Sequence, residues 1–244
     1  MDGEGKTPKQ LLTIGLLEGI GTAILFMGIN FNGGNPVIIV TGLLTAAVLS
    51  GRLTGAHFNM AVTMGVFLAE ENKKMKKNLP FLFTMLISQL IGGFIGQSLA
   101  YSYLTVENIA ILKPMTPDYS AWNVFMIEGL FTFFFVSFVL HNVFPRLSIQ
   151  SDTVLAVGSV CMSLYFSINL ASNYTGAAIN TTFAIVNILF VSLVKDSTYL
   201  RYLPAYLFGT LLGGIFAGLV CKYLVMPSVP HYYDNLLDIY RVDI

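Results

Sequence analysis

Two asparagines at matching points of an internal duplication are the residues of this sequence best suited to chemistry. Asn59 occurs in GAHFNMA at 55 to 61, and Asn180 occurs in GAAINTT at 176 to 182, 121 residues later. Each precedes a short apolar segment, and asparagine is a preferred helix N-cap whose amide hydrogens stay available to a solute. Two helix N-termini that meet would donate hydrogen bonds to a neutral oxygen and repel cations. The alternative is that both asparagines only cap their helices, with no pore between them.

Further candidate residues lie beside these asparagines or deep within apolar segments. The expected pore midplane consists of Asn59, Met60, Ala61, Asn180, Thr181 and Thr182. His57 is expected to line an inner vestibule, either as a pH-sensitive gate or as a hydrogen-bonded loop anchor. Glu18 and Glu128 are the acidic residues deep within spans, and a carboxylate inside a membrane is a functional candidate by default.

The elements that must position these residues are membrane helices. Of the 244 residues, 55% are hydrophobic and 11% charged, against roughly 25% charged in a soluble domain. A membrane helix needs about 20 apolar residues. Six apolar segments are plausible full spans, and two remaining pieces of about 11 to 15 residues, 59–69 and 180–194, have the length of re-entrant half-helices. The six predicted spans are 11–30, 36–50, 79–103, 121–144, 152–170 and 200–225.

The chain is expected to form a single transmembrane domain over residues 11–225, between polar tails at 1–10 and 226–244. Repeat one covers about 11–103 and repeat two about 121–225. LEGIGTAILF at 17 to 26 matches IEGLFTFFFV at 127 to 136, and QLIGG at 89 to 93 matches TLLGG at 210 to 214. Each half holds three spans, so the second half must enter the bilayer inverted. Inverted repeats place their irregular segments near the midplane, where the site is expected.

The distribution of Lys and Arg predicts the orientation. With the N-terminus inside, ten of these residues fall inside and three outside, which favours both termini inside by the positive-inside rule. The inside face would be cytosol or an organelle matrix, and the sequence does not identify the membrane. EENKKMKK at 70 to 77 contributes much of this bias; it is interpreted as a solvated loop, with an anionic-lipid contact as the alternative.

The pattern resembles the aquaporin, or major intrinsic protein, family over about 210 residues. The resemblance rests on E-x-x-x-T in the first span of each half, G-A-x-x-N before each half-helix, and a glycine-rich third span. It implies an all-α membrane protein with six transmembrane helices, two re-entrant half-helices and an inverted 3+3 repeat. The family tripeptide is Asn-Pro-Ala, whereas this chain has Asn-Met-Ala and Asn-Thr-Thr.

The resemblance also implies an outer selectivity filter. Where the family usually has an arginine, three residues after the second asparagine, this chain has Phe183. Family spacing places the other filter positions at Ile39, Ile168 and Ala177. All four side chains are apolar, and such a ring gates by dewetting or closes the path as a plug.

Structural roles are expected for two further groups of residues. By resemblance, Glu18 and Glu128 accept hydrogen bonds from the re-entrant loops; a proton relay is the alternative. Small residues at helical spacing let helices approach closely. Five glycines are expected to pack the two halves together: Gly92, Gly96, Gly213, Gly214 and Gly218.

The predicted function is passive permeation of water or a small uncharged solute through a channel in the lipid bilayer. The resemblance implies a homotetramer. One alternative is a non-conducting subunit of a larger membrane assembly; another is a proton-coupled transporter that uses both glutamates. No enzyme motif, metal-ligand spacing or cofactor motif is present, so no enzyme activity, metal or cofactor is predicted. With net charge zero, no nucleic-acid partner is predicted either.

Overall fold

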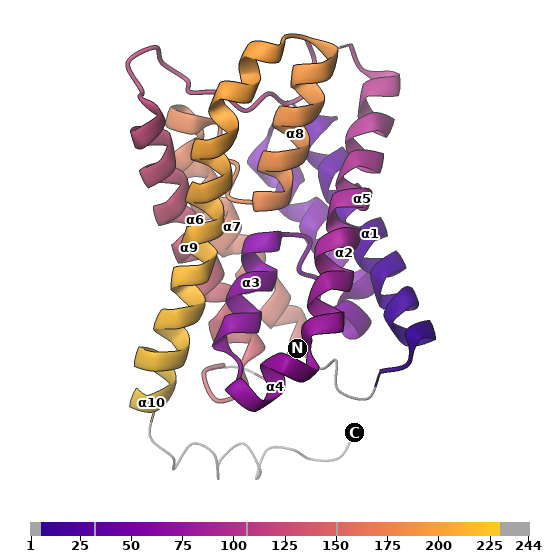
Figure 1. The fold of residues 1–244 in the computed structure, drawn as a ribbon, viewed down its shortest axis with the longest axis vertical. Coiled ribbons are helices and arrows are strands. Elements are labelled where there is room, and N and C mark those ends of the chain that lie inside the picture. Colours follow the sequence, from indigo (N-terminus) through magenta and orange to yellow (C-terminus); the bar gives the residue numbers. More distant parts are fainter. Residues whose placement is uncertain (1–5, 32, 106, 150, 230–244) are drawn as a thin grey trace.

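The predicted spans and half-helices are confirmed by the helical fold (Figure 1). The computed structural model describes residues 6–31, 33–105, 107–149 and 151–229. Within these ranges, six helices are long and apolar enough to cross a membrane. Five are α1 (Pro8–Asn30), α2 (Pro36–Thr54), α5 (Leu79–Tyr103), α6 (Ala121–Val143) and α7 (Thr153–Thr175). The sixth runs from η1 (Ser197–Tyr202) through α9 (Leu203–Val220) and the π-helical η2 (Cys221–Val225) to α10 (Met226–Ser228).

Two short helices occupy the middle of the bundle. In Figure 1, α3 (Met60–Ala69) and α8 (Thr181–Val194) extend in opposite directions from the centre, so their N-termini meet there. The preceding asparagine caps each helix: the Asn59 side chain accepts a hydrogen bond from Ala61 N, and that of Asn180 accepts one from Phe183 N. Both half-helices therefore begin where the capping pattern predicts.

α2 and α7 extend four and five residues beyond their predicted ends. α2 reaches Thr54 and α7 reaches Thr175, because each helix stops at a left-handed glycine, Gly55 (φ 84°) or Gly176 (φ 79°). The last turns of α2 and α7 are more polar than the rest of each helix, so the hydropathy decreases several residues before the helix ends. The last helical residue of each is a buried threonine, Thr54 or Thr175, and the re-entrant loop follows it.

At the chain start and in the lysine-rich segment, the predicted boundaries also need correction. α1 begins at Pro8 because Thr7 and Gln10 form a capping box, so helix replaces the last residues of the expected 1–10 tail. The expected loop at 70–77 contains a short helix, α4 (Asn72–Lys77). At the other end of the domain, α10 (Met226–Ser228) makes the first residues of the expected 226–244 tail helical, so the last span runs past its predicted end at 225. Residues 1–5 and 230–244 of the expected tails lie outside the described residues.

Glycines bring helices into contact within each half, which corrects part of the prediction. A Cβ on Gly92 would lie 2.1 Å from the Gly19 carbonyl oxygen, and one on Gly213 would lie 2.4 Å from that of Gly129. These contacts join α1 to α5 and α6 to α9. Gly96 likewise packs on α1, so three of the five glycines do not link the halves. Gly214 and Gly218 do so, because they face α3 from α9.

Candidate functional site: the re-entrant junction and its cavity

The loops that lead into the half-helices share an unusual backbone. Ala56 (φ 53°) and Phe58 (φ 48°) are left-handed, as are Ala177 (φ 56°) and Ile179 (φ 46°) 121 residues later. Each such non-glycine residue costs roughly 1–3 kcal/mol, so surrounding contacts must hold it. The matching pattern shows that the duplication extends to individual backbone angles. It turns the backbone carbonyls away from regular helical pairing.

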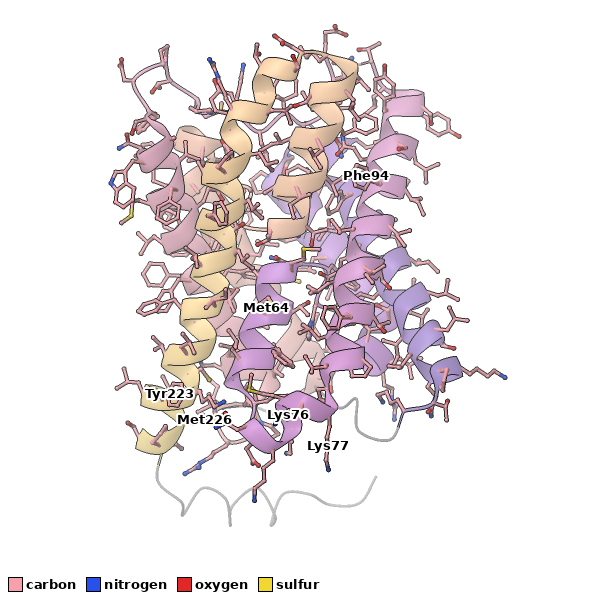
Figure 2. The ribbon with its side chains drawn as sticks, in the orientation of Figure 1. Met64, Lys76, Lys77, Phe94, Tyr223 and Met226 are labelled. Atoms are coloured by element: carbon pink, nitrogen blue, oxygen red, sulfur yellow. The ribbon has the colours of Figure 1, made fainter. Side chains whose placement is uncertain are left out.

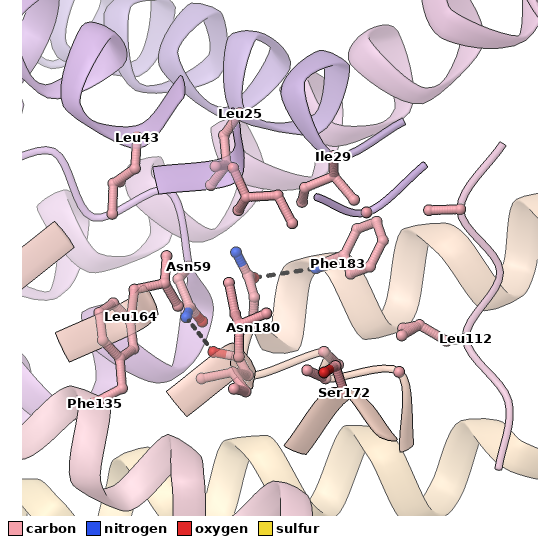
Figure 3. Close-up of a pocket in the computed structure, with 18 of the residues that line it drawn as sticks. Leu25, Ile29, Leu43, Asn59, Leu112, Phe135, Leu164, Ser172, Asn180 and Phe183 are labelled. Carbon is pink, nitrogen blue, oxygen red and sulfur yellow. Dashed lines mark hydrogen bonds between the residues drawn. The ribbon is translucent and has the colours of Figure 1, made fainter. Parts of the chain in front are cut away.

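The two asparagines cross-link the loops. Asn59 Nδ2 donates to the Ile179 carbonyl oxygen at 2.9 Å, and Asn180 Nδ2 donates to that of Phe58 at 3.0 Å. An amide group carries two donor hydrogens, so each side chain keeps one for a solute. Figure 3 shows both asparagines side by side at the cavity wall. The two are therefore more than caps: each fixes the backbone of the opposite half.

The residues that replace the expected prolines also bond across this junction. Met60 N donates to Thr182 Oγ1 at 3.0 Å, and Thr181 N donates to Asn59 Oδ1 at 3.2 Å. Proline has no N–H, so neither bond would exist with proline at these positions. The Thr182 hydroxyl is the acceptor that an alanine would lack. With Ala61, these residues are buried in the junction behind the cavity, outside its lining.

One cavity of about 80 Å³ brings the predicted filter and the asparagines together (Figure 3). A single water needs about 10–15 Å³ by this measure, so several waters or one small solute fit. The predicted residues in the lining are Ile39, His57, Asn59, Ile168, Ala177, Asn180 and Phe183.

An apolar collar around the asparagines was not predicted. It consists of Leu25, Leu43, Phe135 and Leu164, all lining the cavity. The repeat offsets pair Leu25 with Phe135 and Leu43 with Leu164. Because symmetry-related positions of an inverted repeat face the same axis, these offsets could have revealed the collar.

Phe183, at the predicted filter position, is part of an aromatic pair. Its ring contacts that of Phe26 edge-on, with centroids 5.2 Å apart, and both residues are buried. A pair of this geometry contributes roughly 0.5–1.5 kcal/mol beyond burial. The ring is therefore held in place in the cavity wall.

The family follows from comparison with known proteins. A family model described as Major intrinsic protein matches residues 18–222. The chain belongs to the major intrinsic protein family. This is a family of channels for water or small solutes, and the chain is accordingly an integral multi-pass membrane protein.

The individual relatives have low sequence identity to this chain, but the matches cover most of its length. The chain is 23% identical over 224 residues to "Aquaporin AqpM" of Methanothermobacter marburgensis, covering 90% of this chain and 85% of the relative. It is 27% identical over 185 residues to "Aquaglyceroporin" of Toxoplasma gondii, and that match covers 75% of this chain and 65% of the relative. The X-ray structure of the aquaglyceroporin from Plasmodium falciparum has the same fold. That match has a TM-score of 0.75 at 17% identity and covers 90% of this chain and 98% of the other.

In this major intrinsic protein, both predicted carboxylates hold re-entrant loops. Glu128 accepts from Ala178 N (2.9 Å), Ile179 N (2.8 Å) and the Thr175 hydroxyl (2.6 Å). Glu18 Oε1 accepts from Phe58 N (2.6 Å) and Gln89 Nε2 (2.8 Å). These contacts support the structural role over a proton relay.

His57 lines the cavity and is also tied to the loop. Its Nδ1 lies 3.1 Å from Thr63 Oγ1, which accepts from Gln89 Nε2 at 2.9 Å. Gln89 also bonds Glu18, so a polar chain runs from the buried carboxylate to the cavity wall. These bonds favour the anchor over the gate.

The outer wall of the cavity includes a segment that sequence reasoning missed. Residues 110–112, in the connection between α5 and α6, line the cavity. Asn187 accepts from Leu112 N at 3.0 Å and donates to the Ala110 carbonyl at 2.7 Å. Asn30 accepts from Ala110 N at 3.1 Å. The available signal was the presence of amide side chains within apolar spans, since these need a partner in a membrane.

Proposed function

We propose that this protein conducts small neutral solutes, water among them, by passive diffusion. The observation that carries the proposal is the shared cavity: one space is lined by Ile39, Ile168, Ala177 and Phe183 and reaches Asn59 and Asn180. No covalent step or cofactor is needed for such transport, and we assign the chain no enzyme activity.

Permeation rests on sparse polar groups in an apolar wall. The asparagine amides offer donors at the midplane. Residues 176–178 line the cavity, and their carbonyls accept no hydrogen bond from the described residues, so we expect them to accept from a solute. The facing N-termini of α3 and α8 add positive potential there, which excludes cations. A neutral molecule with one donor and one acceptor meets these conditions.

The apolar filter sets the preference among neutral solutes. Phe183 stands at the position where the family usually has an arginine, so the side chains of the proposed filter offer no hydrogen bond to water. Dehydrating water there is costly, whereas a solute with an apolar face regains contact with Phe183 and Ile168. We therefore expect small amphiphilic solutes such as glycerol to pass faster, relative to water, than through an arginine filter.

Liposome swelling tests the proposal. Purified protein reconstituted at known density is challenged with water, glycerol and urea gradients. Asn180→Leu removes one midplane donor and should slow every solute, whereas Leu49→Ala, on the exposed face of α2, serves as the matched control. Swelling no faster than empty liposomes for all three solutes would rule out conduction.

A non-conducting structural subunit is the second candidate, and one observation favours it. The residues that line the cavity include none of α3 (Met60–Ala69), so the cavity does not extend along that half-helix. A path that ends at the asparagines would not conduct. Stoichiometric co-purification with unrelated subunits, together with absent swelling, would support this candidate.

We also propose that both termini lie inside and that the chain forms a homotetramer. Lys195 follows α8, Arg201 lies in η1, and Lys113 lies in the connection between α5 and α6. Figure 1 shows the turn from α8 to α9 and the α5–α6 connection at the end of the bundle opposite α4, which agrees with the positive-inside rule. Arg241, one of the ten inside residues, lies outside the described residues. Protease protection in sealed vesicles tests the orientation, and mass measurement in detergent tests the assembly.

A further inference from the structure

A second cavity lies on the outer face of the bundle, away from the pore. It has a volume of about 650 Å³ and lies between α1 and α5, whose residues line it. Its walls are apolar side chains with large exposed fractions: Leu12, Leu16, Ile20, Ile87, Ile91 and Ile95. The space is therefore open to the hydrocarbon of the membrane.

Glycines create this groove. Gly15, Gly19 and Gly92 line it, and the α1 and α5 backbones approach so closely that a Cβ on Gly92 would clash with the Gly19 carbonyl. The floor is consequently backbone, while the neighbouring leucines and isoleucines rise on both sides. From Pro8 to Ala23 the groove runs about 22 Å at 1.5 Å per residue. One leaflet of hydrocarbon is about 15 Å deep, so an acyl chain fits along the groove for its full depth.

The groove ends among positive charges. Lys9 is exposed in the first turn of α1, one residue after Pro8 of the lining. α4 leads into α5 and carries the exposed Lys73, Lys74, Lys76 and Lys77. Figure 2 shows Lys76 and Lys77 projecting from this end of the bundle. Of the nearby acids, Glu70 is buried and accepts from Asn78 Nδ2 at 2.6 Å. Glu71 is exposed.

The other half of the molecule supplies an internal contrast. Phe133 and Phe216 correspond to Ala23 and Ile95, and their rings meet 5.3 Å apart across α6 and α9. Two aromatic rings thus bridge α6 and α9 in the second half, where an alanine and an isoleucine leave the space between α1 and α5 open in the first. Because the repeat is inverted, the corresponding end also lies on the opposite side, away from α4.

We propose that the α1–α5 groove and the lysines at its end bind an anionic phospholipid. One acyl chain lies in the groove, and the phosphate headgroup meets Lys9 and the α4 lysines. Lysines near an anionic surface each favour binding severalfold, and the groove adds van der Waals contact along one acyl chain that a solvated loop would not have. This proposal is independent of solute conduction.

Lipid retention by the purified full-length chain tests it. Delipidated protein in detergent is exposed to equal amounts of phosphatidylglycerol and phosphatidylcholine, and bound lipid is counted by native mass spectrometry. We expect preferential retention of phosphatidylglycerol. Lys9→Gln and Lys76→Gln should each lower it about fivefold at low salt. The matched pair Lys113→Gln and Lys195→Gln, at the other end, should leave it unchanged.

The groove is tested separately. Ala23→Phe with Ile95→Phe copies the aromatic bridge of the second half and should reduce retention of both lipids. If that variant does not fold, Ile87→Trp fills the groove from a position 56% exposed, with Leu49→Trp, at 57%, as its control. Equal retention of both lipids, unchanged by the lysine variants, would overturn the proposal. So would a groove variant that changes only the oligomer mass, which would assign the groove to a second copy of the chain.

Discussion

The two halves of the molecule hold equivalent loops by different means. In the second half, both oxygens of Glu128 accept hydrogen bonds, two of them directly from loop N–H groups. In the first half, Glu18 Oε1 accepts from Phe58 N and Gln89 Nε2, whereas the His57 N–H and the Thr54 hydroxyl interact with the carboxylate without making a hydrogen bond of normal geometry to Oε2. Thr210, the counterpart of Gln89, instead contacts Thr181 at 2.9 Å.

The asparagines show the reverse imbalance. Asn59 Oδ1 accepts from Ala61 N and from Thr181 N of the other half, whereas Asn180 Oδ1 accepts from Phe183 N within its own helix. Duplication thus preserved the backbone path while each half acquired its own anchors. In the second half the carboxylate makes more of the hydrogen bonds that hold the loop, and in the first half the asparagine does.

The largest expected effect of a single change is that of Glu128→Gln. The amide NH₂ cannot accept, so at least one loop N–H or the Thr175 hydroxyl loses its partner in a buried site. An unsatisfied buried group costs roughly 1–3 kcal/mol, and we expect a loss near the upper end. Thermal unfolding in detergent micelles, followed by circular dichroism, measures it. Unchanged stability would show that the second loop does not depend on this carboxylate.

A smaller loss, about 1–2 kcal/mol, is expected for Thr182→Ala. The change leaves Met60 N–H buried without an acceptor. Adding Met60→Pro removes that donor, and Asn59 (φ −156°, ψ 120°) already has the extended backbone that precedes proline. The double variant should therefore recover most of the loss, as measured by the same unfolding assay in a double-mutant cycle. Additive losses would show that the Met60–Thr182 bond is not what replaces the proline.

Phe183→Val tests the filter, because Val62 occupies the equivalent position of the first half. Removing the ring opens the cavity and ends the contact with Phe26. We expect glycerol flux in the swelling assay to rise about fivefold, equivalent to roughly 1 kcal/mol of barrier. Val62→Ile, in the first half, is the control with little expected change. Faster water flux with unchanged glycerol flux would contradict an amphiphile-selective filter.

The smallest effect is expected for Glu18→Gln, within about 0.5 kcal/mol of the parent. Oε1 keeps both of its bonds, and the new NH₂ can occupy the Oε2 position, where no hydrogen bond of normal geometry is lost. Unfolding and solute flux should both stay near parental values. A loss equal to that of Glu128→Gln would remove the contrast between the halves, and abolished pH-dependent uptake would favour the proton-coupled alternative.

Much of the site was predictable because it depends on local chemistry. The position of Asn59 and Asn180 before short apolar segments indicates helix caps. Carboxylates within membrane spans are rare, which identifies Glu18 and Glu128 as candidates. The collar and the 110–112 wall were missed. Helices in a membrane are apolar toward lipid and core alike, so hydropathy does not show which face of α1 or α7 meets the pore.

By itself, the sequence determined the membrane class, the six spans, the two half-helices and the inverted duplication. These follow from span length, capping and spacing, which act over a few residues or repeat at a fixed offset. Tertiary structure alone decided the bonds across the junction, such as Met60 to Thr182, the packing of Phe183 on Phe26, and the groove between α1 and α5. The partners in these contacts lie about 70 to 160 residues apart, and only the folded chain sets their distance and orientation.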